Sequence, residues 1–212
     1  MKTIYTELAE ANKAALLYGN EYKKRLDVLT KLYTEFTAAN IEWEISCSCA
    51  LFLDGIVDNF HDFDILIAPT SYEKAYQILS KLGKDTNAVY HPLFDDAEFA
   101  KFEIDGIDVD IICEFGFWTF DSHWQYHFNQ DDICYKQIGN LNLPCVPTEI
   151  QYIFYAMMVG WQPQRAFKRD LISSYLTNGN LKKTHLLKDA ADSGELPPFL
   201  IVSIYDILDT EK

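Results

Sequence analysis

The sequence predicts a mixed α/β (α+β) fold, in which a small mixed sheet is flanked by helices and followed by a C-terminal helical region. Three observations support this prediction. Apolar residues recur at three-and-four spacing over residues 21–39, side chains alternate over residues 43–48 and 101–111, and helical spacing returns after Pro147. A period near 3.6 is typical of amphipathic helices, and a period of two is typical of strands.

The first regular helix is predicted over residues 21–39, and a less regular helix precedes it. Its apolar stripe consists of Tyr22, Leu26, Leu29, Tyr33 and Phe36. Residues 43–48 then predict a half-buried strand, because apolar and polar side chains alternate along it.

A second strand is predicted over residues 62–67, and a helix follows it. Thr70 and Glu73 have the spacing of a capping box at the start of that helix. Gly83 is expected to end it, since glycine readily adopts the left-handed conformation found at helix ends.

Residues 101–111 predict a β-hairpin, because Asp105-Gly106 separates two alternating runs. A two-residue turn would place Ile104 opposite Ile107 and Phe102 opposite Val109. The apolar side chains would then share one face of the hairpin, and Glu103, Asp108 and Asp110 would share the other.

Apolar residues take up helical spacing from Pro147 onward, which predicts a boundary between a domain of residues 1–146 and a helical region of residues 147–212. Thr148 and Gln151 have the spacing of another capping box. Further helices are expected around residues 164–176, 181–192 and 198–208.

Composition limits the classes of function. The chain has 212 residues and a formal net charge of −14, which disfavours duplex nucleic acid as a main partner and favours cations. No apolar run approaches the roughly 20 residues of a membrane helix, so no membrane partner is expected. The first 20 residues lack a signal-peptide pattern, and five cysteines indicate free thiols. We therefore expect a cytoplasmic protein.

Asp62 and Asp64 are the strongest candidates for a functional site. They lie two apart on the predicted strand, so both carboxylates leave the same face. Two such charges disfavour each other's ionisation unless a cation lies between them. Mg²⁺ is the usual cation at such a site, where it binds one or two carboxylates together with substrate phosphates.

The same pair is also compatible with a solvated strand edge. The hairpin favours a functional site, because it adds further acids that need compensation. Lys101, opposite Asp110 in the predicted register, could supply that compensation, and so could a metal.

The order of these motifs resembles the nucleotidyltransferases of the DNA polymerase β superfamily, especially the small bacterial enzymes that modify aminoglycoside or lincosamide antibiotics. Their pattern is a Gly-Gly or Gly-Ser element, then Asp-x-Asp, then a later strand with a third Asp. Here Cys47-Ser48-Cys49-Ala50-Leu51, Asp62-Phe63-Asp64 and Ile107-Asp108-Val109-Asp110-Ile111 occupy these places. The resemblance implies a small nucleotidyltransferase-type sheet flanked by helices.

The resemblance also implies an enzyme that transfers a nucleoside monophosphate from a nucleoside triphosphate to a hydroxyl of a small acceptor, with release of pyrophosphate. ATP is the expected donor, and the acidic surface favours a cationic acceptor. Asp62 and Asp64 would hold one Mg²⁺. Asp110 would help to hold a second and would ease removal of the hydroxyl proton, either by stabilising the alkoxide or by acting as general base. Asp108 points the same way as Asp110, which is preferred for its Val-Asp-Ile context.

Three further residues are predicted to contact the nucleotide. Ser48 would donate to a phosphate, although it could equally cap the turn. Cys47 stands where the family has glycine, whose backbone approaches the phosphates closely. Lys168, in the segment RAFKRDLISSYL, could contact phosphate or lie on a solvated helix face whose Phe167 points inward.

Alternative functions follow from the same residues. The change at Cys47 favours a nucleotidyltransferase fold that binds a nucleotide or a protein without catalysis. A third alternative is modification of RNA or protein, and the negative charge disfavours RNA. A zinc site at Cys47, Cys49 and His61 has poor spacing, and buried thiols are the preferred interpretation.

Overall fold

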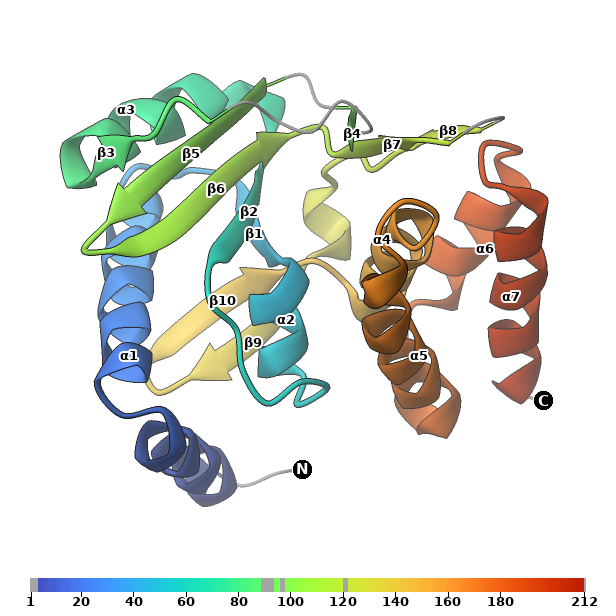
Figure 1. The fold of residues 1–212 in the computed structure, drawn as a ribbon, viewed down its shortest axis with the longest axis horizontal. Helices are drawn as coiled ribbons and strands as arrows, with labels where there is room; N and C mark the ends of the chain where they lie inside the picture. The colour runs from blue at the N-terminus through green and yellow to red at the C-terminus, as the bar shows by residue number, and fades with distance from the viewer. Residues whose placement is uncertain (1–3, 89–93, 96–97, 120–121, 212) are drawn as a thin grey trace.

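The computed structural model describes residues 4–88, 94–95, 98–119 and 122–211, and it has a mixed sheet with helices on both faces (Figure 1). In these residues one sheet has seven strands, in the order β3 (Lys84–Asp85), β5 (Glu98–Ile104), β6 (Ile107–Cys113), β2 (Phe63–Ile67), β1 (Trp43–Ser46), β10 (Leu141–Cys145) and β9 (Cys134–Ile138). A smaller sheet has the order β4 (Phe94–Asp95), β7 (Gly116–Trp118) and β8 (His123–Gln125). The predicted mixed α/β class is confirmed.

The helices divide between the two faces of the large sheet. They are α1 (Ile4–Ala38), α2 (Cys47–Leu53), α3 (Tyr72–Leu82), α4 (Thr148–Met158), α5 (Ala166–Tyr175), α6 (Thr184–Asp192) and α7 (Pro198–Leu208). Helices α1 and α3 cover one face, and α4 to α7 gather on the other side (Figure 1). Among the described residues, no helix combines the length and the apolarity that a membrane span requires.

Short helical turns connect several of these elements. They are Pro69–Ser71, Gln130–Asp132, Pro163–Arg165, Leu176–Asn180 and Asp209–Glu211. β10 ends at Cys145 and α4 begins at Thr148, close to the predicted boundary. The division into domains of residues 1–146 and 147–212 stays a prediction.

The N-terminal helix consists of two segments, as the sequence predicts. Gly19 has φ 55° and interrupts the helical backbone. The buried stripe after it differs slightly from the prediction, because Val28 and Leu32 are fully buried while Leu26 and Tyr33 are only half-buried. The face of the helix that packs against the sheet is therefore rotated slightly from the predicted face.

The predicted hairpin is confirmed, including its register. Ile104 pairs with Ile107 and Phe102 with Val109. Asp105 and Gly106 both have positive φ, as the two central residues of a type I′ turn require. Lys101 consequently lies opposite Asp110.

Strand β1 differs from the prediction, because it is buried on both faces. Glu44 and Ser46 were predicted to face solvent, and both are fully buried. The reason is the order of the strands, which places β1 inside the sheet with α4 against its polar face. Its polar side chains therefore need partners from within the protein.

The helix ends also differ from the prediction. Neither predicted capping box forms, since Thr70 donates to Glu42 and Thr148 to Asp54. Gly83 ends α3 in an extended conformation with φ −153°. A side chain at Gly83 would collide with the backbone of Glu103, so close approach to β5 explains the glycine.

Candidate active site

Four cross-strand neighbours form a polar row on the face of the sheet toward the C-terminal helices. Ser46 on β1 pairs with Asp64 on β2. Asp64 pairs with Asp110 on the parallel neighbour β6, and Asp110 pairs with Lys101 on β5. Paired residues project from the same face of a sheet, so the side chains of the row lie side by side.

Asp62 and Ser48 lie at the edge of this row. Asp62 directly precedes β2, and the Ser48 hydroxyl lies in the first turn of α2, 3.4 Å from Asp62 Oδ1. The structure therefore brings Ser48, Asp62, Asp64 and Asp110 into one cluster.

Burial and neighbouring charges raise the pKa of two carboxyl groups of the cluster, Asp64 and Asp110. Burial, followed by the charges of Asp62 and Asp110, raises the pKa of Asp64 to about 7, although Arg165 opposes the shift. Burial raises the pKa of Asp110 to about 6 despite Lys101, and Asp62 adds to the rise. A cation bound between these groups would relieve this repulsion.

Lys101 gives the cluster partial compensation. Its Nζ lies 2.7 Å from Asp108 Oδ2 and 3.5 Å from Asp110 Oδ1. Asp110 Oδ1 is buried and has no hydrogen-bond partner within the described residues. The Asp108 side chain is 47% exposed and that of Asp110 only 18%, so Asp110 lies deeper and nearer to Asp64.

The donor atoms of the cluster fit a hard divalent cation. They are carboxylate oxygens, which Mg²⁺ prefers, and the buried oxygen Asp110 Oδ1 has only the 3.5 Å ion pair with Lys101. Within the described ranges, no three His, Cys, Asp or Glu side chains converge closely enough to hold a metal ion by themselves. Mg²⁺ commonly uses one or two carboxylates and completes its shell with phosphate oxygens and water. The cluster therefore suits a cation that arrives together with a phosphate-bearing ligand.

Cys47 adopts a backbone conformation that favours glycine. Its φ is 50°, in the left-handed region that side chains other than Asn and Asp rarely adopt. Its thiol is buried and accepts a hydrogen bond from Ser46 Oγ at 3.7 Å, and burial, followed by the charge of Asp64, raises its pKa. The turn thus has the backbone conformation that glycine favours, although the residue at this position is a cysteine.

Lys168 on α5 and Arg165 in the turn before it face the cluster. Arg165 and Lys168 are half-buried, and each lies over the ring of Tyr155, at 5.7 Å and 5.5 Å. Burial and the charge of Arg165 lower the pKa of Lys168, while Asp64 and Asp62 oppose the shift. If the basic residues lay on a solvated helix face, Phe167 would point inward. Phe167 is instead 69% exposed. The helix therefore turns its cations inward.

Sequence analysis missed Gln151 as part of this site. Its Oε1 accepts from the Cys47 backbone N–H at 3.1 Å, and its Nε2 donates to Ser46 Oγ at 3.2 Å. The capping-box interpretation assigned this side chain to its own helix. No local signal in the sequence indicates a contact with a turn 104 residues away.

The aromatic side chains that follow β6 pack in the core or against each other, and the residues of the disfavoured zinc site differ in exposure. Trp124 and Tyr126 are buried in the core, and Trp118 stacks on His123 with ring centroids 4.0 Å apart. Cys47 and Cys49 are buried free thiols, and His61 is exposed, which agrees with the preferred interpretation of these three residues.

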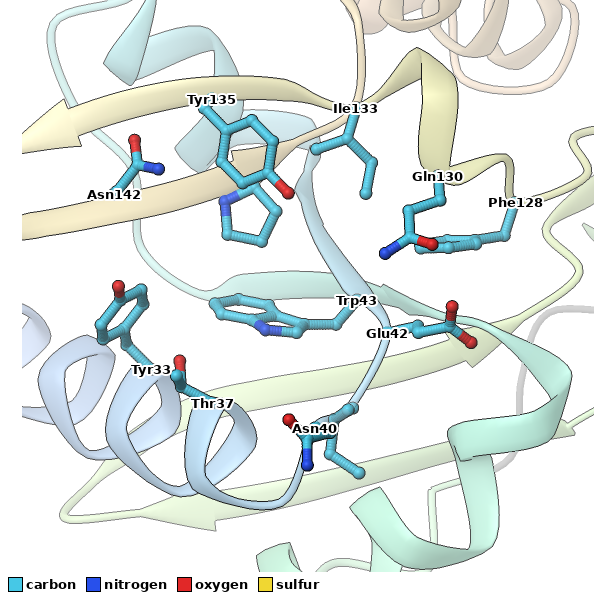
Figure 2. Close-up of a pocket in the computed structure, with 12 residues that line it drawn as sticks. Tyr33, Thr37, Asn40, Glu42, Trp43, Phe128, Gln130, Ile133, Tyr135 and Asn142 are labelled. Carbon is cyan, nitrogen blue, oxygen red and sulfur yellow. The ribbon is translucent and has the colours of Figure 1, made fainter.

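A groove of about 480 Å³ opens at the other end of β1, between α1 and β9. Trp43 lies at its centre, flanked by Tyr33 and Tyr135, with Glu42 to one side (Figure 2). Trp43 pairs with Ile67, at the opposite end of the β1–β2 pair from Ser46 and Asp64. The groove is therefore separate from the carboxylate cluster.

Comparisons with known proteins agree with this geometry. A family model described as aminoglycoside-2''-adenylyltransferase matches residues 28–173. A solved structure of a candidate nucleotidyltransferase from Thermotoga maritima has a TM-score of 0.58 at 18% identity, over 70% of this chain and 93% of its own. ANT(2'')-Ia in complex with adenylyl-2''-tobramycin has a TM-score of 0.54 at 12% identity, over 89% of this chain and 99% of its own. No curated protein sequence matches significantly. The resemblance to small antibiotic nucleotidyltransferases is confirmed.

Proposed function

The chain belongs to the aminoglycoside-2''-adenylyltransferase family, and on this premise we propose that it transfers AMP from ATP to a hydroxyl of a small cationic acceptor. The acceptor oxygen bonds to the α-phosphorus, the bond between the α-phosphorus and the bridging oxygen breaks, and pyrophosphate leaves with the electron pair. The net charge of −14 favours a cationic acceptor.

The observation that carries this proposal is the pairing of Asp64 with Asp110, next to Asp62 and opposite inward-facing cations. Asp62 and Asp64 would hold one Mg²⁺, and Asp110 would help to hold a second. When bound, these ions neutralise the triphosphate and make the acceptor hydroxyl more acidic.

The side chains of the cluster have distinct parts in the transfer. The pKa of Asp110 is raised to about 6, and its Oδ1 has only a 3.5 Å ion pair with Lys101, so the carboxylate can accept the proton of the acceptor hydroxyl. Ser48 and the N–H groups at the start of α2 can donate to phosphate oxygens. Lys168, with Arg165, supplies positive charge on the opposite side.

The test is release of pyrophosphate from ATP in the presence of Mg²⁺ and a panel of aminoglycosides, with Asp64→Asn as the inactive control. Calorimetric titration with Mg²⁺ and a non-hydrolysable ATP analogue adds a readout that needs no acceptor. Binding that is lost in Asp64→Asn supports the site. A folded wild type that binds no nucleotide and releases no pyrophosphate contradicts the proposal.

Binding of a nucleotide or protein without catalysis is the second candidate, and Cys47 favours it, since a buried thiol beside Asp64 occupies space that glycine would leave open. It predicts that Asp62→Asn and Asp64→Asn keep the binding function.

The free thiols Cys47, Cys49 and Cys145 support a cytoplasmic location for the protein, because free cysteines are typical of a reducing compartment.

A further inference from the structure

The turn from β1 into α2 is held in place from outside its own segment. Cys47 has φ 50°, a conformation that glycine adopts without strain and that cysteine keeps only when surrounding contacts stabilise it. The contacts come from Gln151 on α4, which accepts from the Cys47 N–H and donates to Ser46 Oγ. Both groups of the Gln151 amide are therefore used on this turn.

The environment of Gln151 makes these two hydrogen bonds strong constraints. The side chain is fully buried, with an exposed fraction of 0%, and so is Ser46. Ser46 Oγ also donates to Cys47 Sγ at 3.7 Å, so loss of the amide would leave chiefly the buried Cys47 N–H without a hydrogen bond.

Gln151 also connects the turn to the cationic side of the cluster. Tyr155 lies four residues further along α4, on the same face of the helix. Its ring lies beneath Arg165 and Lys168. One face of α4 thus contacts the turn that carries Ser48 and the two cations opposite it.

We propose that Gln151 is a positioning residue: it holds Cys47 in the left-handed conformation and so keeps the Ser48 hydroxyl beside Asp62, where it can donate to a phosphate of the nucleotide. This inference rests on the proposed function for its consequence, although the anchoring itself concerns only the turn. A glycine at position 47 would need the anchor less, because glycine pays no steric penalty at φ 50°.

The first experiment measures the turn independently of any activity. In Gln151→Met, which keeps the length of the side chain but cannot donate or accept as the amide does, the Cys47 thiol should react with a thiol reagent at least tenfold faster than in wild type. Peptide mass spectrometry separates the cysteines, and buried Cys145 serves as the internal reference. Glu149→Gln is the matched control, because Glu149 is buried on the same helix but accepts from the Lys182 and Lys183 N–H groups. It should leave the Cys47 rate unchanged.

The second experiment separates positioning from a merely structural role. Gln151→Met should weaken binding of the ATP analogue and lower kcat/KM for ATP at least tenfold. In a Cys47→Gly background the same substitution should cost less than threefold, because the strained residue is gone. A role confined to packing of α4 would give the same loss in both backgrounds.

Several results would overturn the inference. They are an unchanged Cys47 rate in folded Gln151→Met, an equal acceleration of Cys145, and equal losses in the two backgrounds. If Gln151→Met does not fold, Gln151→Asn keeps the amide but is too short to reach both partners, and the same comparisons apply. A wild type that transfers no AMP would overturn the proposed function, while the labelling rates would still decide whether Gln151 holds the turn.

Discussion

Asp64 and Asp110 lie directly opposite each other on the parallel strands β2 and β6. The charge of Asp110 raises the pKa of Asp64, so a cation between the two would stabilise both ionised carboxylates. Asp108, two residues earlier on β6, is more exposed and forms the shorter ion pair with Lys101. The pairing therefore gives different surroundings to two acids that share one face of the strand.

We expect Asp110→Asn to lower the rate of AMP transfer by about 100-fold or more, because it removes a metal ligand and the proton acceptor. Asp108→Asn should stay within about threefold of wild type, since its carboxylate is half exposed and pairs with Lys101 rather than with Asp64. Pyrophosphate release under saturating ATP measures both. Equal losses in the two variants would show that cross-strand pairing with Asp64 does not determine which acid serves as the third carboxylate.

Lys101 should be needed for stability mainly in the absence of metal. Lys101→Met leaves Asp110 beside Asp64 without its partner and should destabilise the protein by about 1–2 kcal/mol, a value reduced from that of fully buried pairs because Lys101 is partly exposed. Mg²⁺ with nucleotide would restore the missing positive charge. Thermal unfolding should therefore show a larger stabilisation by Mg²⁺ and the ATP analogue in Lys101→Met than in wild type. An equal shift in the two proteins would argue against a shared cation at the cluster.

The direction of α5 can be tested with two neighbouring residues. Lys168 faces the cluster over Tyr155, whereas Arg169 forms an ion pair with exposed Asp170. Lys168→Met should lower kcat/KM for ATP by about 10- to 100-fold, because it removes a charge opposite the triphosphate. Arg169→Met should change it less than about threefold. A larger effect of Arg169→Met would place the phosphates on the other side of the helix.

The parts of this site that were predictable from sequence are those whose partners are local. Asp105-Gly106 fixes the hairpin through turn geometry alone, so its register and the position of Asp110 follow. The shared face of Asp62 and Asp64 follows from the period of a strand.

The parts that were not predictable depend on partners far along the chain. Thr70 and Thr148 have the spacing of capping residues, but Glu42 and Asp54 provide competing acceptors. The two-sided burial of β1 results from α4, which begins about 100 residues later, and the sequence of β1 gives no sign of it. For the same reason Gln151 could not be identified as a residue of the site.

Glu44 on β1 predicts a pH dependence of stability. It is fully buried, donates nothing when ionised, and accepts one hydrogen bond, from Tyr126 at 2.9 Å. Burial raises its pKa from 4.5 to about 7, although the Tyr126 hydrogen bond opposes the shift. The folded state thus holds a proton that the unfolded state releases at lower pH.

This difference makes the folded protein less stable relative to the unfolded state as pH rises from about 4.5 to 7. Below about pH 4.5 the carboxyl is protonated in both states and costs nothing, and as pH rises toward 7 the unfolded state gains stability by ionising first. Glu44→Gln keeps the size and the hydrogen bond to Tyr126 without a titrating group. Its free energy of unfolding relative to wild type should therefore rise between about pH 4.5 and 7, by up to roughly 3 kcal/mol, and then level off. Urea unfolding of both proteins across this range measures the difference, and a difference that stays constant with pH would mean that Glu44 is already ionised in the folded protein.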